Sequence, residues 1–494
     1  MKPLFLSLLL TALPVCAQSI ATTVLPLPGG AGSATPQVAS AYDGSLYVSW
    51  TEPAGTGHAL RIAQFDRDAE RWAEPVTIAS GDNWFINHAD TPQIAAGLRG
   101  KVAAAWFVYS DGDDDHAYHA IVSTSEDHGR TWSEPRPLST ESDRTEFVSL
   151  APLINGDWLA LWLDGRAAGG HDHADHGAGA MQLYSRVLGS DAPDTLVDDR
   201  VCDCCSIASL VLPNGAVLAA YRDRSETEVR DIAYMMYRRG AWQPADAPVA
   251  DGWTIDGCPV NGPSLSRRGA HVAVAWFTAA DGIPAVKTAR STNAAHSWDR
   301  YGRLSAADAL PKGRVATAVV RGGSQWIAWV GADDAIALRE LDADGRPSET
   351  VFDLPGATTG FPRLTVLDQI DGQPTRLLLA RTEPGANGMA GRVATYAISL
   401  PANPEIIVDD CGCGPGGDPN RGHALRGRIE GILPDRNALL VQHEEVPGVM
   451  RAMTMMFNVD PRVIPLVKED QQILARMERR DDGKWWLFNL RLLE

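Results

Sequence analysis

A histidine and several methionines lie close together near the C-terminus, between His443 and Met456. Met453 and Met455 are two residues apart, so on a β-strand both side chains lie on the same face. His443 ends the preceding expected strand and would meet them across the strand pair. Two thioethers and an imidazole select Cu(I) or Ag(I) over Mg(II) or Ca(II). The alternative interpretation is that these methionines only fill a hydrophobic core.

Four cysteines form a second group that could bind a metal. Cys202, Cys204 and Cys205 lie within one short segment, and Cys258 follows later in the chain. Adjacent cysteines rarely bond to each other, because the ring is strained. Two interpretations remain open. One of the three bonds to Cys258 as a disulfide, or the thiolates bind a soft metal such as Cu(I).

Two further segments carry residues that could bind metal. Cys411 and Cys413 lie in a Gly/Pro-rich stretch that is typical of a linker, where they could pass metal between sites. His171, His173 and His176 lie in a Gly/Ala-rich loop together with two aspartates. That loop could chelate Cu(II), Zn(II) or Ni(II), or it is a solvated polar loop.

The elements that must position these groups repeat along the chain. Short apolar segments recur every 51 to 59 residues and end at Trp50, Trp106, Trp162, Tyr221, Trp276, Trp329 and Ala380. Gly, Asp and Asn turns separate further strand-like segments, so each repeat holds about four short strands. This pattern predicts a β-propeller of seven blades. A first strand near 20–27 would close the ring against a last blade that ends near Leu400.

One segment connects these repeats to a known family. Residues 125–132 (SEDHGRTW) match the Asp-box pattern S-x-D-x-G-x-x-W, and a weaker copy begins at Ser291. Residues 18–400 therefore resemble the sialidase-like (BNR-repeat) propellers. Members of that family usually have six blades, which is the alternative to the count of seven. The family's R-I-P motif is missing, and no arginine precedes Arg61 after the leader.

Polar residues at two repeat strands are weak candidates for a catalytic centre of the sialidase type. They are Asp164, Arg166, Tyr221, Arg222, Arg224 and Glu228. Three interpretations stay open: salt bridges at the junctions between blades, glycosidase chemistry, or an anion or partner site.

The C-terminal segment also resembles a known family. His443, a turn with proline, and the run Ala452-Met453-Thr454-Met455-Met456-Phe457 are similar to the signature of the Cus-type periplasmic copper/silver chaperones. The resemblance implies a five-stranded OB-like barrel that binds Cu(I) or Ag(I) through His443, Met453 and Met455. The best-known members cap the metal with a tryptophan. In this sequence Met450 lies near the position of that tryptophan, and it is a candidate third thioether ligand.

Residues 1–17 (MKPLFLSLLLTALPVCA) have the charged start, apolar run and small residues of a secretory signal peptide cut near Ala17. The mature chain is expected to be periplasmic or secreted, with no transmembrane segment. The chain has 44 Lys and Arg against 62 Asp and Glu, a net charge of −18. This charge argues against nucleic acid as a partner.

The sequence thus predicts an all-β chain with a signal peptide (1–17), a propeller (18–405), a Gly/Pro/Cys linker (406–422) and a small copper-binding barrel (423–494). We expect an exported protein that handles Cu(I) or Ag(I). Its propeller would hold a second Cys-rich site or dock an efflux or copper-delivery partner. The alternative is an exo-sialidase-type hydrolase with an accessory metal domain, so enzymatic activity is left open.

Overall fold

The computed structural model of the chain divides into two compact units, the N-terminal sheets as far as Leu400 and the C-terminal barrel. The structure describes residues 20–110, 117–167, 180–245, 250–305, 310–368, 375–385, 390–401, 405–406, 422–446, 448–480 and 482–493. The predicted signal peptide, the histidine-rich loop and the linker cysteines Cys411 and Cys413 lie outside these residues. Among the described residues, no helix is long and apolar enough to span a membrane.

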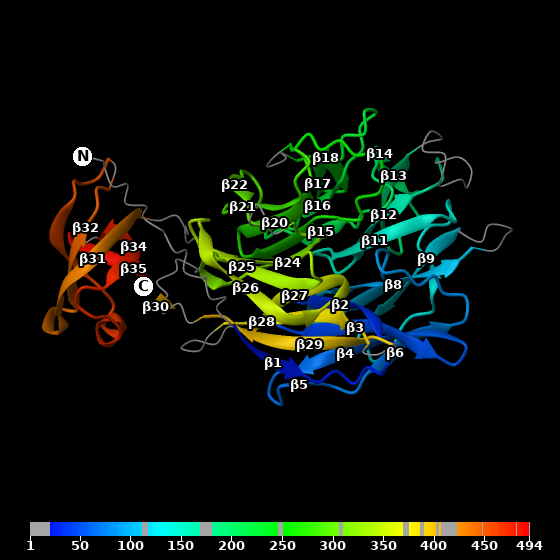
Figure 1. Cartoon of the computed structure of the whole chain (residues 1–494), viewed down its shortest axis with the longest axis horizontal. Helices are drawn as coiled ribbons and strands as arrows, with labels where there is room; N and C mark the ends of the chain where they lie inside the picture. The colour runs from blue at the N-terminus through cyan, green and yellow to red at the C-terminus, as the bar shows by residue number, and fades with distance from the viewer. Residues whose placement is uncertain are drawn as a thin grey trace, which may run out of the picture. The chain divides into compact units, whose positions relative to one another are not determined.

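The N-terminal unit consists of seven antiparallel sheets of four or five strands each (Figure 1). The first sheet contains β2 (Ala34–Ser40), β3 (Leu46–Ala54), β4 (Gly57–Asp66), β5 (Arg71–Trp72) and β6 (Val76–Gly81). The second contains β7 (Gln93–Ala96), β8 (Val102–Tyr109), β9 (Tyr118–Ser125) and β10 (Arg136–Pro137). The third contains β11 (Thr145–Pro152), β12 (Trp158–Asp164), β13 (Met181–Val187) and β14 (Thr195–Val201).

The remaining four sheets follow the same strand order. The fourth contains β15 (Ala208–Val211), β16 (Val217–Arg222), β17 (Ile232–Arg238) and β18 (Ala241–Pro244). The fifth contains β19 (Ser264–Arg268), β20 (His271–Thr278), β21 (Ala285–Ser291) and β22 (Asp299–Arg303). The sixth contains β23 (Gly313–Val319), β24 (Gln325–Val330), β25 (Ala335–Leu341) and β26 (Pro347–Ala357), and the seventh contains β27 (Thr359–Asp368), β28 (Arg376–Glu383), β29 (Arg392–Ser399) and β1 (Ala21–Leu25).

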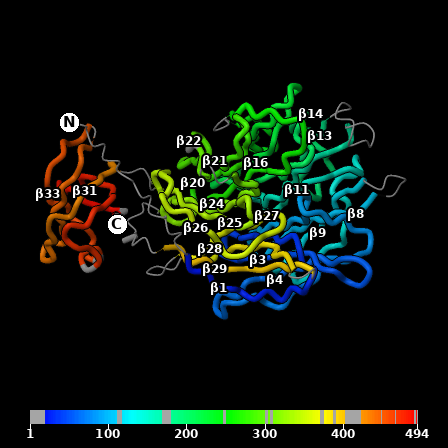
Figure 2. The backbone as a smooth tube through the Cα atoms, viewed as in Figure 1, coloured from blue at the N-terminus to red at the C-terminus, as the bar shows by residue number. Residues whose placement is uncertain are grey.

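The first strands of successive sheets contact one another around a closed ring, from β2 through β7, β11, β15, β19 and β23 to β27, which returns to β2. The ring makes the sheets the blades of a propeller. The predicted seven blades are confirmed, and the alternative of six is wrong. The ring is closed by β1, which lies beside β29 (Figure 2). The two strands are antiparallel, with Ala21 opposite Ser399 and Leu25 opposite Thr395.

The second strand of each blade is buried almost throughout. All seven residues of β12 and all six of β16 are buried, and Trp50, Trp162 and Trp276 are among the largest fully buried side chains. Both faces of such a strand pack against neighbouring blades, so it is continuously apolar rather than alternating. This packing explains why the repeated aromatic residues mark one strand in each blade.

The predicted Asp-box segment forms the turn between β9 and β10, the outer strands of the second blade. Asp127 Oδ1 accepts hydrogen bonds from the backbone amides of Arg130 (3.1 Å) and Thr131 (2.8 Å). Gly129 has a φ of 78°, which favours glycine. Trp132 Nε1 donates to the carbonyl of Gly129 at 2.9 Å. The turn is therefore fixed by local hydrogen bonds, away from the first strands of the blades.

The C-terminal unit is a small closed barrel. Its strands are β31 (His423–Leu433), β32 (Ala438–His443), β33 (Met453–Asn458), β34 (Gln472–Arg479) and β35 (Trp485–Leu493), and β30 (Glu405–Ile406) pairs with β35. Antiparallel pairs join β32 to β33, β32 to β31, β31 to β34 and β34 to β35, and a parallel contact between Asn458 and Trp486 closes the barrel.

The barrel has its own hydrophobic core, which includes Ile429, Leu439, Val441, Phe457 and Ile473, all fully buried. The predicted small barrel of five strands is therefore confirmed. Short 3₁₀ turns occur in both units, at η1 (Leu98–Gly100), η2 (Arg321–Gly323), η4 (Pro434–Arg436) and η5 (Pro461–Leu466).

Candidate metal centres

The barrel brings the histidine and two of the methionines together. His443 lies directly opposite Met453 in the antiparallel pair of β32 and β33, and Met455 lies opposite Val441. These four side chains therefore share one face of the two strands. Burial increases along that face from Met453, which is 52% exposed, through the half-buried Met455 to the fully buried Phe457. The thioethers thus lie where the interior of the barrel meets solvent.

The His443 ring is positioned as a metal-ligating histidine would be. Its side chain is buried, and Nδ1 lies 2.6 Å from the carbonyl oxygen of Glu444. Because a carbonyl only accepts, Nδ1 must carry the proton, which leaves Nε2 with a lone pair. Nε2 is buried and has no hydrogen-bond partner among the described residues. Metal-ligating histidines usually donate the other ring N–H to such a carbonyl, so the site suits a metal ion.

Two other methionines lie near these residues in the chain. Met450 is held by a tight turn in which its amide and carbonyl both bond to Val446, and its half-buried side chain packs against the barrel core. Met456 lies on the opposite face of β33 from Met455 and is 38% exposed. Only Met450 is therefore a candidate further ligand, as the sequence predicts.

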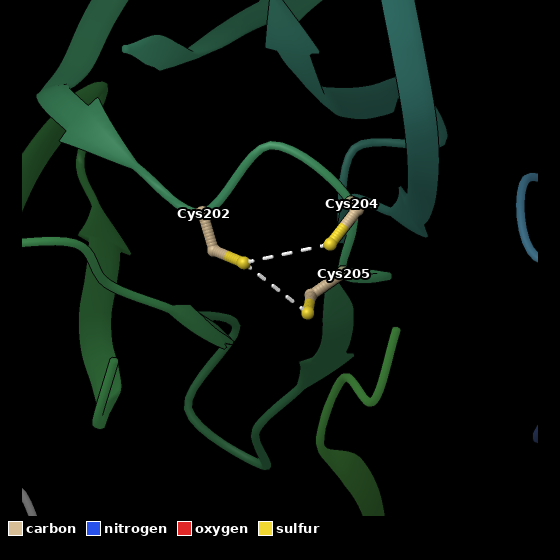
Figure 3. Close-up of side chains that lie close together, drawn as sticks. All are labelled: Cys202, Cys204 and Cys205. Carbon is tan, nitrogen blue, oxygen red and sulfur yellow. Dashed lines mark hydrogen bonds between the residues drawn. The ribbon is translucent and has the colours of Figure 1, made fainter. Parts of the chain in front are cut away.

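The propeller brings three cysteines together in the segment between β14 and β15 (Figure 3). Cys202 Sγ lies 3.3 Å from Cys205 Sγ and 3.9 Å from Cys204 Sγ. Cys258, from the segment before β19, is exposed, and a side-chain hydrogen bond with Cys204 lowers the pKa of the Cys258 thiol. None of these four described cysteines forms a disulfide. The fold therefore brings the sulfur atoms of Cys202, Cys204 and Cys205 within 4.8 Å of one another, and it places Cys258 next to Cys204 at the edge of this group.

Arg230 provides the positive charge beside this cluster. Its Nη1 donates to Cys202 Sγ at 3.2 Å. Hydrogen bonds from Cys204 and Cys205, together with the charge of Arg230, hold the pKa of the Cys202 thiol well below its usual range. The opposite shift, to a higher pKa, occurs at Cys204 because of its sulfur neighbours and at Cys205 because of burial. Among these three cysteines, Cys202 is therefore the thiol whose surroundings most favour ionisation.

Two of the predicted catalytic candidates belong to the surroundings of this cluster. Arg224 Nη2 pairs with Glu228 Oε1 at 2.9 Å, and its Nη1 pairs with Asp203 Oδ2 at 2.7 Å. Glu228 Oε2 also accepts from Arg230 Nη2 at 2.5 Å. Asp203 lies between Cys202 and Cys204 in the sequence, but its carboxylate pairs with Arg224. Glu228 therefore pairs with both arginines, and its pair with Arg230 helps to hold that guanidinium against Cys202.

Arg222 is another predicted catalytic candidate, and its guanidinium makes hydrogen bonds to backbone carbonyls. It is buried, and its guanidinium donates to the carbonyls of Asn261 (3.0 and 2.8 Å), Phe277 (2.8 Å) and Arg230 (2.5 Å). Tyr221, the residue before it, donates to Asp198 Oδ2 at 2.5 Å. Both side chains thus join β16 to its neighbours.

Asp164 and Arg166, the remaining candidates, bond to each other at the end of β12. Arg166 Nη2 lies 2.8 Å from Asp164 Oδ2 and 2.7 Å from Asp194 Oδ2. The Asp164 carboxylate is fully buried and also accepts from Trp162 Nε1 at 2.7 Å and from Ser142 Oγ at 3.0 Å. The ion pair and hydrogen bonds therefore join the end of β12 to the segments that carry Ser142 and Asp194.

The structure also shows a buried acidic group for which the sequence gives no spacing signal. Tyr118 lies 3.0 Å from both Asp90 Oδ2 and Glu146 Oε2. Burial raises the pKa of Glu146 to about 7 and raises that of Asp90 well above its ordinary value. The three residues come from three different strands or loops, so only the packed propeller brings them together.

The barrel region matches a known family. Residues 422–490 match the family model described as "Copper binding periplasmic protein CusF". The resemblance seen in the sequence is confirmed for this part of the chain. No curated protein was found to match the chain.

Several solved propeller structures are similar to the chain at low identity. A Hadza microbial sialidase is 13% identical over 70% of this chain and 74% of its own, with a TM-score of 0.40. An α-L-arabinofuranosidase of Fusarium graminearum is 15% identical over 75% and 93%, with a TM-score of 0.42. The BP39L lectin of Burkholderia pseudomallei is 14% identical over 70% and 95%, with a TM-score of 0.45. The propeller assignment for this chain comes from its own sheets.

Proposed function

We propose that the protein binds monovalent copper at the end of its C-terminal barrel through His443, Met453 and Met455. The buried Nε2 of His443, which lacks a partner while Nδ1 donates to a carbonyl, supports this assignment most directly. Two thioethers on the same strand face complete a soft donor set. Met450 is the proposed third sulfur ligand. Ag(I) has the same ligand preference and would compete for the site.

The uneven exposure of the ligands supports metal transfer rather than permanent storage. Met453 is 52% exposed, so a ligand from another protein can bind the metal before the buried imidazole of His443 dissociates from it. A stepwise exchange of this kind keeps the copper bound throughout. We therefore propose that the protein hands Cu(I) to an efflux or copper-delivery partner. Its propeller would dock that partner or hold a second metal site.

The proposed location is the periplasm. The N-terminal seventeen residues support it through their signal-peptide pattern, with cleavage proposed near Ala17. The family that matches the barrel is described as periplasmic. Exchange among soft neutral ligands suits a compartment where thiols are readily oxidised.

The test is a competitive Cu(I) titration of the full mature chain under anaerobic conditions. Met453→Leu and Met455→Leu together should weaken one copper site by on the order of 100-fold or more, because both sulfur ligands are lost while side-chain volume is kept. Met456→Leu is the matched control, since Met456 lies on the other strand face. Equal affinities for the double variant and the control would refute the assignment.

A further inference from the structure

The four cysteines of the propeller are not used by the barrel site, and they come from two segments that the fold places side by side. Cys202, Cys204 and Cys205 have sulfur atoms that all lie within 4.8 Å of one another, and Cys258 forms a side-chain hydrogen bond with Cys204. We propose that these four cysteines form a second, independent centre that binds one Cu(I) ion in the propeller. The existence of the centre rests on the propeller alone, while the choice of copper rests on the proposed function of the barrel.

The sulfur spacing suits a single shared ion. Sulfur atoms bound at about 2.3 Å in a tetrahedral site lie roughly 3.8 Å apart. The distances from Cys202 Sγ, 3.3 Å to Cys205 and 3.9 Å to Cys204, bracket that value. Only small rotations of the side chains would be needed to bring these sulfurs onto one metal.

The backbone around the sulfurs is fixed before any metal binds. The amide of Cys202 donates to the carbonyl of Arg222 at 3.0 Å. The Arg222 side chain in turn binds the carbonyl of Asn261, and Asn261 Nδ2 donates to the carbonyl of Pro259 at 3.0 Å. This chain of bonds ties the segment that carries Cys258 to the fourth blade.

A glycine allows the two segments to approach closely. A Cβ added at Gly262 would overlap the carbonyl oxygen of Ser206, the residue after Cys205. Any other residue at position 262 would therefore push the Cys258 segment away from the cluster. Glycine at this position permits the approach that places Cys258 next to Cys204.

The charges around the cluster favour an anionic metal–thiolate complex. Arg230 Nη1 contacts Cys202 Sγ, and the buried guanidinium of Arg222 donates to the carbonyl of Arg230. The hydrogen bonds of Arg222 go to backbone carbonyls, so among the described residues no carboxylate neutralises its charge. A Cu(I) ion bound by several thiolates carries net negative charge, which these guanidinium groups would offset.

The four positions differ in access to solvent. Cys202 and Cys205 are buried, Cys204 is half-buried and Cys258 is exposed. Metal could therefore be captured by Cys258 and passed inward to the buried sulfurs. Thiolates select soft ions such as Cu(I), but Zn(II) also accepts four cysteines, so the experiment must separate the two.

The experiment uses the full mature chain with the barrel site removed by Met453→Leu and Met455→Leu, and with Cys411→Ser and Cys413→Ser. The protein is reduced, loaded anaerobically with Cu(I) or with Zn(II), passed over a desalting column with a copper chelator, and analysed for metal per chain. We expect about one Cu(I) per chain, coordinated by sulfur alone in its X-ray absorption spectrum. Cys204→Ser with Cys205→Ser should abolish it.

A second variant separates loss of metal binding from loss of folding. Cys258→Ser changes an exposed residue, so it should fold normally and still weaken Cu(I) binding at least tenfold against the chelator. Near-ultraviolet circular dichroism would report the packing of the buried tryptophans in each variant. Chains with an intact barrel but no propeller cysteines should still bind copper, so failure of one site is distinguishable from failure of the other.

Three results would overturn the proposal. The first is a parent protein that retains no Cu(I) after desalting. The second is retention of Zn(II) but not Cu(I), which would make the centre a structural zinc site. The third is peptide mapping of protein from the periplasm that finds Cys202, Cys204, Cys205 and Cys258 joined as disulfides.

Discussion

The two candidate centres use different sulfur chemistry, which is set by single residues. Met453 and Met455 supply neutral thioethers, and His443 supplies a neutral imidazole, so the bound ion keeps its positive charge. The cysteines supply thiolates, and Arg230 lies at 3.2 Å from the first of them. Neutral ligands at a half-exposed site allow exchange, whereas buried thiolates are expected to hold the metal more tightly.

Burial raises the pKa of the single residue Glu146 to about 7. The folded protein then keeps a proton that the unfolded chain loses near its ordinary pKa, so folding stability falls as pH rises from about 4.5 to 7. In the Glu146→Gln variant, the loss of folding stability over this pH range should be smaller by on the order of 2 kcal/mol. The measurement is urea denaturation at pH 5 and at pH 7.5. An unchanged difference between the two pH values would show that Glu146 does not titrate in this range.

At the scale of elements, strand pairing decides both the closure of the propeller and the register of the barrel site. Pairing of β1 with β29 joins the start of the propeller to its end. Pairing of β32 with β33 places His443 opposite Met453, and a shift of one residue would put the methionines on the other face. The same kind of interaction therefore holds the scaffold and aligns the ligands.

Removal of β1 tests the closure. A chain that begins at Leu27 loses the buried side chains of Ile20 and Leu25 and leaves the edge of β29 unpaired. We expect roughly 3–5 kcal/mol of lost stability and a tendency to aggregate. Calorimetry and light scattering at one heating rate would measure both. A chain that begins at Ile20 is the control, and identical melting of the two chains would contradict the role given to β1.

At the scale of the whole molecule, the propeller and the barrel are separate compact units with separate cores. Each unit carries one candidate centre, and several of the predicted catalytic residues are engaged in contacts within the propeller. Asp164 is fully buried and bonded to Arg166 and Trp162, and Arg222 binds backbone carbonyls. The family match of the barrel supports copper binding, whereas the propeller fold by itself does not determine an activity.

This assignment predicts the result of a glycosidase assay. The full chain should release no product from a fluorogenic sialoside above the blank, because its candidate acid and arginines are committed to structural bonds. Arg166→Ala should lower thermal stability without affecting the assay signal. Turnover by the parent chain that disappears in Arg166→Ala would instead support the alternative of a sialidase-type hydrolase.

The sequence by itself determined the all-β class and the repeat, and it predicted the candidate His/Met set, because each depends on local spacing. Trp50, Trp106 and Trp162 recur at one interval because each fills the same position in its blade, and Met453 and Met455 share a face on any strand. The tertiary structure alone decided what lies far apart in sequence. It placed Cys258 beside Cys204, Arg230 beside Cys202, and Tyr118 between Asp90 and Glu146. It also settled seven blades over six, since ring closure is a property of all the sheets together.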